Sequence, residues 1–402
     1  MIRIGNAQAF WGDRGTAAAE LLAQQPDLDY LTMDYLAEVS LSILAVQQER
    51  DPSLGYARDF VDVVASLAPY WSSGGKCRLI VNAGGLNPRG CAEACRKALE
   101  AAGCRAMKIA VVFGDDVLSL LRNDAANANY QNLDTSAPLS DVLDRLVTAN
   151  AYVGSGPIVE ALKTGAEIVI TGRVADPALA VAAAMYEFGW SETDWNQLAG
   201  ATVAGHLIEC GTQVTGGIFT DWLTVPDPAH IGFPIVEVSA DGSCVVTKPR
   251  GTGGVVNQWT VKEQLTYEVI DPNNYFAPDG VADFTTLHLE EIGPDRVRVT
   301  DMSGKPRPDT LKVCIGYQDG WIAEGLLLFS WPDAMAKACR AEDIVCRRLN
   351  MLGVHPEEIR FELVGINALH GSTAPQPASP RGRASRSGPR STSATAPRAA
   401  RR

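Results

Sequence analysis

The clearest pair of residues for acid–base chemistry is His206 and Glu209, which lie three residues apart in the segment GHLIECG. Residues at this spacing share one face of a helix, so the pair can act as a general acid and base or contribute two ligands to a metal ion. The sequence contains no H-E-x-x-H motif, and two ligands alone do not make a metal site. We therefore predict a catalytic role for both residues and assign no metal site.

A second candidate for moving a proton is Asp34, which lies four residues before Glu38 in the segment MDYLAE. The two carboxylates can face the same site as a pair. Glu38 can equally be a solvated acid at the start of a helix, where the helix dipole favours negative charge. Of the two, Asp34 is the predicted catalytic residue.

The segment NAGGLNPRGC, residues 82–91, lies between a predicted strand and a predicted helix. Its glycines allow positive φ angles or close approach of a ligand, and the free N–H groups at the helix start attract an anion. The arginine in the loop can bind a carboxylate or phosphate through two hydrogen bonds. The spacing matches neither G-x-G-x-x-G nor a phosphate-binding loop, and a simple tight turn is the alternative. We predict an anion or carbonyl site here, with the candidate binding residues Asn82, Gly84, Gly85, Asn87 and Arg89.

Cys91 stands in the first turn of the helix that follows this loop. The helix dipole stabilises a thiolate at such a position, which makes Cys91 a candidate nucleophile. Most small buried cysteines are inert, so a packing role is the alternative.

Two further glycine-containing loops are polar turns next to predicted elements. In TGRVADP, Arg173 is a second candidate for binding an anion, whereas Asp176 and Pro177 suit the cap and first position of the next helix. In RGTGGVVN, the loop around Gly253 precedes another predicted helix and is expected to close over the site. That loop lacks the lysine of a phosphate-binding loop.

The elements that must position these residues alternate between strand and helix in the first half of the chain. Apolar runs predict strands at Ile2–Gly5, Leu28–Met33, Cys77–Val81, Lys108–Phe113 and Glu167–Ile170. Amphipathic patterns predict helices at Thr16–Gln24, Val39–Glu49, Ala57–Leu67, Cys91–Ala102, Leu139–Val147, Ile158–Lys163 and Pro177–Phe188. The alternation predicts an α/β fold, a parallel sheet with helices on both faces.

In a sheet of this type, ligands bind beyond the carboxyl ends of the parallel strands, an edge that we call the crest. The residues at the ends of the predicted strands are all polar or charged: Asn6, Asp34, Asn82, Asp115, Asp116 and Arg173. Turns are generally polar, so each one singly has a simple structural explanation. As a set, they predict one shared site at the crest.

After about Gly200, predicted strands outnumber predicted helices. Strands are predicted at Pro234–Ser239, Cys244–Lys248, Phe284–Glu291, Arg296–Thr300, Thr310–Tyr317 and Ile359–Val364, and helices at Gln258–Tyr267 and Asp333–Leu352. This pattern predicts an α+β domain at residues 201–371 that follows the α/β domain at residues 1–200.

The composition indicates a folded protein that stays out of membranes. Of the 402 residues, 46% are hydrophobic and 20% charged, which is enough apolar material for buried cores. No apolar run approaches the about 18 residues of a membrane helix, and the start, MIRIGNAQAFWGD, lacks the pattern of a secretory signal. Nine scattered cysteines without C-x-x-C spacing favour free thiols. We therefore expect a soluble, cytoplasmic protein.

The formal net charge of −12 is unevenly distributed. Residues 372–402 include seven arginines but no acidic residue and no Leu, Ile, Val, Phe or Met, which predicts a disordered basic tail. Its composition resembles GC-rich coding sequence read in a shifted frame, and a nucleic-acid-binding arm is the alternative. The rest of the chain is strongly acidic, so we expect neither nucleic acid nor membrane as a partner.

Taken together, several segments resemble the acyclic terpene utilisation family, the AtuA-type proteins. They are GNAQAFWGDR, DLDYLTMDYLAEVSLSIL, NAGGLNPRGCAEACRKAL, GDDV, TGRVADPAL, GHLIECGTQVTGG and KPRGTGGVV. The resemblance covers residues 1–371 and implies a cytoplasmic protein encoded beside enzymes that degrade citronellol, geraniol and related branched acids as coenzyme A thioesters. It supplies no catalytic residues. Related proteins continue with an ordered β-rich segment after NALHG, so the resemblance also implies a truncated or frame-shifted end.

We expect an enzyme that acts on a branched carboxylate or acyl-coenzyme A intermediate by lyase or hydratase chemistry next to a carbonyl. Asn82, Asn87 and the loop N–H groups are expected to polarise that carbonyl. The proton is expected to move through Asp34, Glu209 or His206. No cofactor is identified, and coenzyme A is a candidate only as part of the substrate. The alternative is a non-catalytic subunit or small-molecule-binding module; a homo-oligomer and a small partner subunit both remain open.

Overall fold

The computed structural model describes residues 1–124 and 130–373, which form two compact units divided between Asp319 and Gly320. The first unit contains the sheet and every residue predicted to act in the site. From Ala374 onward, the predicted basic tail lies outside the described residues.

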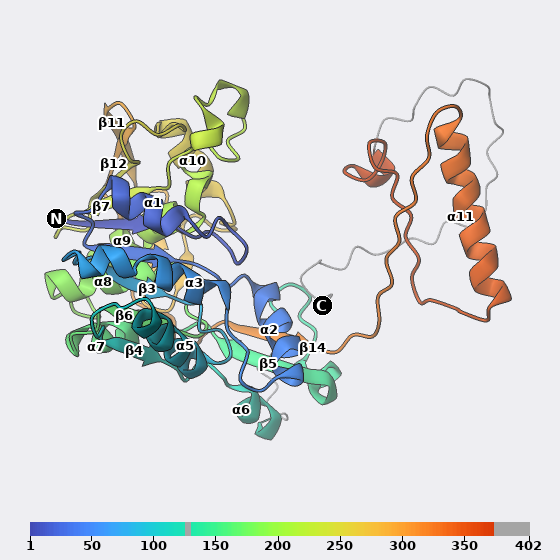
Figure 1. The fold of residues 1–402 in the computed structure, drawn as a ribbon, viewed down its shortest axis with the longest axis horizontal. Helices are drawn as coiled ribbons and strands as arrows, with labels where there is room; N and C mark the ends of the chain where they lie inside the picture. The colour runs from blue at the N-terminus through green and yellow to red at the C-terminus, as the bar shows by residue number, and fades with distance from the viewer. Residues whose placement is uncertain (125–129, 374–402) are drawn as a thin grey trace. The chain divides into compact units, whose positions relative to one another are not determined.

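A large mixed sheet runs through the first unit (Figure 1). Its parallel part has the order β1 (Ile2–Asn6), β2 (Tyr30–Met33), β3 (Arg78–Val81), β6 (Ile168–Thr171) and β4 (Ile109–Val112). On the other side of β1, the sheet continues antiparallel through β7 (Ile235–Val238), β8 (Cys244–Thr247), β12 (Arg296–Thr300) and β11 (His288–Gly293). The parallel strands coincide with the predicted apolar runs, so their carboxyl ends form the predicted crest.

The parallel strands are buried on both faces because their side chains alternate between two hydrophobic clusters. In β3, Ile80 belongs to one cluster, whereas Leu79 and Val81 belong to the other. A strand covered on both faces appears in the sequence as an uninterrupted apolar run. This is why the runs located the strands to within one or two residues.

Helices cover both faces of the parallel strands, as Figure 1 shows. One layer consists of α1 (Ala17–Gln24), α3 (Asp59–Ser66), α4 (Ala68–Ser72) and α5 (Pro88–Ala101). The opposite layer contains α7 (Gly156–Lys163), α8 (Ala178–Phe188) and α9 (Trp195–Glu209), and α10 (Gln258–Thr266) packs on α9 and on the antiparallel strand β11. The predicted α/β fold with helices on both faces is confirmed.

Two small antiparallel sheets complete the first unit. One contains β13 (Ser303–Lys305), β10 (Gly280–Asp283) and β9 (Tyr275–Ala277), and the other contains β14 (Val313–Tyr317) and β5 (Leu146–Ala151). Helices α2 (Glu38–Arg50) and α6 (Leu118–Asn123) pack beside β5. Short 3-10 turns lie at Gly211–Gln213, Trp222–Thr224 and Pro228–His230. Antiparallel strands with few helices after residue 200 agree with the predicted α+β character.

The helix predicted at Leu139–Val147 is wrong. The segment forms two 3-10 turns, Leu139–Asp141 and Leu143–Arg145, and then enters strand β5. β5 pairs with β14, which comes from much later in the chain. A long-range strand pairing of this kind overrides a local helical pattern.

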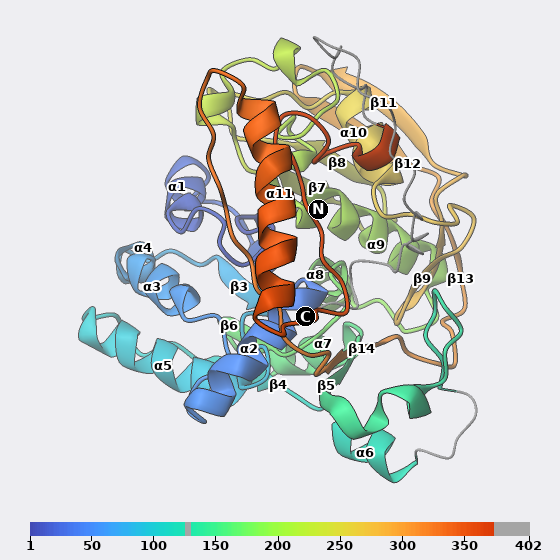
Figure 2. The ribbon, with the colours of Figure 1, turned by 90° about the vertical axis from the view of Figure 1, so that its right-hand side faces the viewer.

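The strand predicted at Ile359–Val364 is also wrong. The segment is irregular, and the described part of the second unit contains no strand with which it could pair. An isolated strand has no partner for its backbone groups and does not persist. The helix predicted at Asp333–Leu352 is confirmed as α11 (Ala334–Met351), which Figure 2 shows as one long helix, and a 3-10 turn follows at Gly371–Thr373.

The patterns in the sequence did not predict α9, although it is the helix that carries His206 and Glu209. Its glycines lower helix propensity but allow close packing. A Cβ at Gly200 would lie 2.2 Å from the carbonyl oxygen of Gly242, and one at Gly205 would lie 2.8 Å from Cα of Pro177. The small residues therefore serve the tight fit of α9 against its neighbours.

Strands from both sides of residue 200 share the large sheet, because β7 pairs directly with β1. The domains at residues 1–200 and 201–371 stay predictions about folding units. In residues 1–124 and 130–373, none of the helices has the length and apolar character needed to cross a membrane.

Candidate functional site

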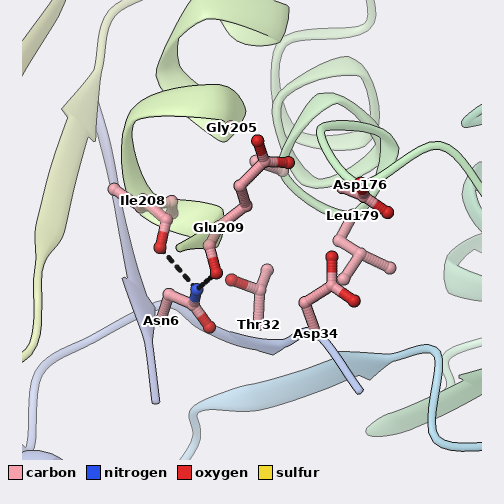
Figure 3. Close-up of a pocket in the computed structure, with 9 residues that line it drawn as sticks. Asn6, Thr32, Asp34, Asp176, Leu179, Gly205, Ile208 and Glu209 are labelled. Atoms are coloured by element: carbon pink, nitrogen blue, oxygen red, sulfur yellow. Dashed lines mark hydrogen bonds between the residues drawn. The ribbon is translucent and has the colours of Figure 1, made fainter. Parts of the chain in front are cut away.

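Three carboxylates from different elements meet at the crest around one small cavity (Figure 3). Asp34 follows β2, Asp176 precedes α8 and Glu209 ends α9. One oxygen of each carboxylate lies within 4.8 Å of the others. The cavity has a volume of about 10 Å³, which is room for about one water molecule or ion.

The floor of the cavity is formed by β1 and β2, through Asn6 and Thr32. The side-chain amide of Asn6 donates hydrogen bonds to the carbonyl oxygens of Ile208 and Glu209, at 2.5 and 2.7 Å. These are among the last carbonyls of α9, which lack partners within the helix. Asn6 therefore holds the end of α9, and Glu209 with it, above the sheet.

The predicted pair on α9 is present, because His206 Nδ1 lies 2.9 Å from Glu209 Oε1. His206 Nε2 lies 2.8 Å from the backbone carbonyl oxygen of Gln264. A carbonyl can only accept, so Nε2 carries a proton, and the Nδ1–Oε1 contact holds one further proton between ring and carboxylate. With both ring nitrogens engaged, His206 is not a metal ligand.

Burial and charge act on this pair in opposite directions. Burial raises the pKa of Glu209, and the hydrogen bond and charge of His206 oppose that rise. Burial lowers the pKa of His206, but the hydrogen bond and charge of Glu209 outweigh it, so the net shift is upward. The side chain of Glu209 is only 10% exposed. Its second oxygen, Oε2, is buried and has no hydrogen-bond partner in the described residues.

Asp34 is held by the end of β3. Asn82 donates its side-chain amide to Asp34 Oδ1 at 2.7 Å, and the Leu36 backbone N–H donates to the same oxygen at 3.1 Å. The side-chain oxygen of Asn82 accepts from the Tyr35 N–H at 2.7 Å. Burial raises the pKa of Asp34, and the positive charge of Arg173 opposes that rise. Asn82 therefore positions the carboxylate.

Arg173 is buried, with 1% of its surface exposed, and its guanidinium is engaged by groups of the protein. Nε donates to the carbonyl oxygen of Val174 at 2.8 Å, and the terminal nitrogens donate to the carbonyl oxygen of Leu36 and to Asp176 Oδ1. The guanidinium carbon lies 4.2 Å from the centre of the Tyr152 ring. Direct binding of a substrate anion by Arg173 stays a prediction.

Asp115 supports the crest next to Arg173 and does not line the cavity. Its Oδ2 accepts hydrogen bonds from the side-chain amide of Asn150 at 2.8 Å and from the backbone N–H of Arg173 at 2.9 Å. Burial raises the pKa of Asp115, and these two hydrogen bonds oppose the rise. The contacts fix the turn from which the Arg173 side chain extends.

The loop at residues 82–91 satisfies most of its polar groups within the protein. The side-chain amide of Asn87 donates to the carbonyl oxygens of Ser53 and Leu54, both at 3.0 Å, and its oxygen accepts from the Gly90 N–H at 2.9 Å. Arg89 is exposed, with its guanidinium 4.5 Å from the centre of the Phe113 ring. None of these residues lines the cavity, and their role in binding stays a prediction.

The glycines of this loop are required by packing. A Cβ at Gly85, where φ is +51°, would lie 2.3 Å from Leu44 Cδ1. A Cβ at Gly84 would lie 2.5 Å from the carbonyl oxygen of Thr171 and 2.6 Å from Pro88 Cβ. The loop is therefore pressed against β6 and against α2.

We expect Gly84→Ala to lower the free energy of unfolding by about 1–3 kcal/mol, because the added methyl group meets backbone that cannot move aside. Urea unfolding measures the effect. Gly156→Ala is the matched control, since no atom lies within 4 Å of a Cβ at Gly156, and it should be neutral or mildly stabilising. Unchanged stability of Gly84→Ala with weakened ligand binding would instead support the predicted anion site.

Cys91 and Gly253 are both closely surrounded by protein atoms, and their predicted roles in the site stay predictions. Cys91 is fully buried, and a hydrogen bond with Cys95 together with burial raises the pKa of its thiol, the opposite of what activates a nucleophile. The Gly253 N–H donates to the carbonyl oxygen of His230 at 2.8 Å, and a Cβ at Gly253 would lie 1.9 Å from the carbonyl oxygen of Asp227. All nine cysteines are free thiols, as predicted.

Sequence reasoning missed Asp176 as a member of the site. The predicted cap role is wrong, because the cap of α8 is Pro177, without a side-chain hydrogen bond, and the Asp176 carboxylate instead accepts from Arg173. Asp176 could have been identified as an acid in the turn after β6, because residues from the whole turn after a parallel strand can lie at the crest.

The sequence model of a family described as acyclic terpene utilisation family protein AtuA matches residues 2–398. The match extends past Gly371, where the resemblance was expected to end. The comparisons found no matching curated protein and no matching solved structure.

Proposed function

Because the chain belongs to the acyclic terpene utilisation family AtuA, we propose that it is an enzyme that moves a proton next to the carbonyl of a branched carboxylate or acyl-coenzyme A intermediate. Family membership implies involvement in the utilisation of acyclic terpenes. The lyase or hydratase chemistry is our proposal, and so is a cytoplasmic location.

The observation that carries the proposal is the cavity that Asp34, Asp176 and Glu209 share. Removing a proton next to a carbonyl needs a base held in a site from which bulk water is excluded. Asp34 and Glu209 are buried carboxylates whose pKa values are raised by burial, which brings them closer to the range in which a carboxylate both takes up and releases a proton. His206 holds Glu209 in place and shares its proton.

Access to the cavity is supported by the exposure of one of its carboxylates. The Asp176 side chain is 34% exposed, whereas that of Glu209 is 10% exposed. We propose that the reacting end of the substrate approaches past Asp176. Lys312 is half exposed, pairs with Glu38 at 3.3 Å and lies 4.7 Å from the centre of the Tyr152 ring. We propose that an anionic part of the substrate exchanges with Glu38 as the partner of Lys312.

The proposal is tested by exchange of substrate hydrogen with solvent, which reports proton removal even when the complete reaction is unknown. The full chain is incubated with citronellyl-coenzyme A, and separately with citronellic acid, in deuterated buffer. We expect deuterium to be incorporated at the carbon next to the carbonyl at least about 100-fold faster than in buffer alone. Mass spectrometry measures the rate of incorporation. Folded protein with no exchange above buffer for either compound would contradict the proposal.

The alternative, a non-catalytic subunit, is favoured by the surface of the second unit. Its described residues include large apolar side chains that are almost fully exposed, such as Trp321, Leu328 and Trp331. Exposed apolar surface of this kind marks sites of protein interaction. If this alternative holds, the isolated chain shows no exchange, and a partner protein restores it.

A further inference from the structure

We infer that Asp34, Asp176 and Glu209 together bind one hard divalent cation, of the Mg²⁺ or Mn²⁺ class, in the cavity between them. The use of this cation in catalysis rests on the proposed function, whereas its binding rests on the geometry alone.

The first support is the way in which the protein holds each carboxylate by one oxygen. Asp34 Oδ1 accepts from Asn82, Asp176 Oδ1 accepts from Arg173, and Glu209 Oε1 faces His206. In metal sites, hydrogen bonds to one side of a ligand orient it and leave its other atom for the ion. The same arrangement holds at all three acids. Figure 3 shows that the acids come from three separate parts of the chain.

The second support is an unpartnered buried atom at the same cavity. Glu209 Oε2 has no hydrogen-bond partner in the described residues, and its side chain is nine-tenths buried. Glu209 is one of the residues that line the cavity. A buried carboxylate oxygen without a partner costs free energy. A cation in the cavity would satisfy it.

The third support is charge. One oxygen of each of three carboxylates lies within 4.8 Å of the others, and like charges this close repel one another. The buried guanidinium of Arg173 balances one negative charge, through Asp176. A cation in the cavity would add positive charge to the three carboxylates beyond what Arg173 and the proton shared with His206 supply.

The chemistry of the ligands selects the class of cation. All three are carboxylates, and the neighbouring imidazole of His206 has both nitrogens engaged. Oxygen ligands without thiolate or imidazole suit Mg²⁺ and Mn²⁺. A substrate oxygen would reach such a cation from the side where Asp176 is exposed. A cation that binds the substrate carboxylate or carbonyl oxygen would stabilise the negative charge formed when the proton leaves.

The test is a Mn²⁺ titration of the full chain after treatment with chelator. Electron paramagnetic resonance measures binding as the loss of the signal of free Mn²⁺. We expect one Mn²⁺ per chain, displaced by Mg²⁺. Glu209→Gln and Asp176→Asn should each weaken binding by at least about tenfold, because loss even of groups that only orient ligands weakens binding by about 10–100-fold. Asp62→Asn, at an exposed acid on α3, is the matched control and should bind as the wild type does.

Folded wild-type protein that binds no Mn²⁺, or binding that neither variant weakens, overturns the inference. If Glu209→Gln does not fold, Asp176→Asn carries the same test at a more exposed position. The outcomes separate this inference from the proposed function. Deuterium exchange without Mn²⁺ binding would contradict the cation site and support the proposed function. One bound Mn²⁺ per chain without exchange would support the cation site and contradict the proposed function.

Discussion

Replacing Arg173 by methionine should lower the free energy of unfolding by about 2–6 kcal/mol, because two buried carbonyl oxygens lose their donor and each such loss costs about 1–3 kcal/mol. The guanidinium is 1% exposed and donates to two backbone carbonyl oxygens and to Asp176. Methionine approximates the volume of the arginine stem but donates no hydrogen bond, so these acceptors lose their donors. The loss also removes the positive charge beside Asp34. Urea unfolding followed by circular dichroism measures the change.

The control for this variant is Arg96→Met. Arg96 pairs with Glu93 and Glu100 on the surface of α5, where its side chain is 48% exposed. Exposed ion pairs contribute little because solvent screens them, so Arg96→Met should change stability far less. If Arg173→Met instead keeps its stability and loses affinity for an anionic ligand, Arg173 is a binding residue, as the sequence suggested, and its structural role is wrong.

Asp34→Asn should reduce the rate of the proposed deuterium exchange by about 10²–10⁴-fold, the usual contribution of a positioned acid or base. The substitution conserves the shape of the side chain but removes its charge and its ability to take up a proton. Asp34 is buried at the cavity and held by Asn82, so no solvent-exposed group can take its place. Initial exchange rates of variant and wild type, compared at equal concentrations of folded protein, measure the effect.

Glu38→Gln is the matched control, since Glu38 was the other half of the carboxylate pair considered from the sequence. Its side chain is half exposed and interacts with Tyr152 and Lys312, and it does not line the cavity. Burial acts to raise the pKa of Glu38, but the hydrogen bond from Tyr152 and the charge of Lys312 outweigh burial and lower this pKa to about 2. Glu38 is therefore ionised at neutral pH and poorly suited to take up a proton. A large loss of rate in Glu38→Gln with a small loss in Asp34→Asn would reverse these assignments.

The parts of the fold that the sequence predicted are those governed by local rules. Strands buried on both faces appear as apolar runs, and β1, β2, β3, β4 and β6 were found in this way. Elements decided by distant partners were missed. β5 is a strand because β14 pairs with it. The glycines of α9 lower its helix propensity, but they let the helix pack closely against its neighbours, and this packing stabilises the helix.

For the site, the sequence by itself identified polar residues that follow the parallel strands, because the ends of parallel strands meet at one edge of a sheet. It also supplied the three-residue spacing of His206 and Glu209, which brings the two side chains together only because the segment is a helix. Only the tertiary structure decided which polar groups are already occupied. Arg173 and Asn87 are used by the protein itself, and Asp176 joins Asp34 and Glu209 at the cavity. The physical reason is that a hydrogen bond between separate elements depends on how those elements pack. The spacing of two residues along the chain does not determine the distance between a donor and an acceptor on separate elements.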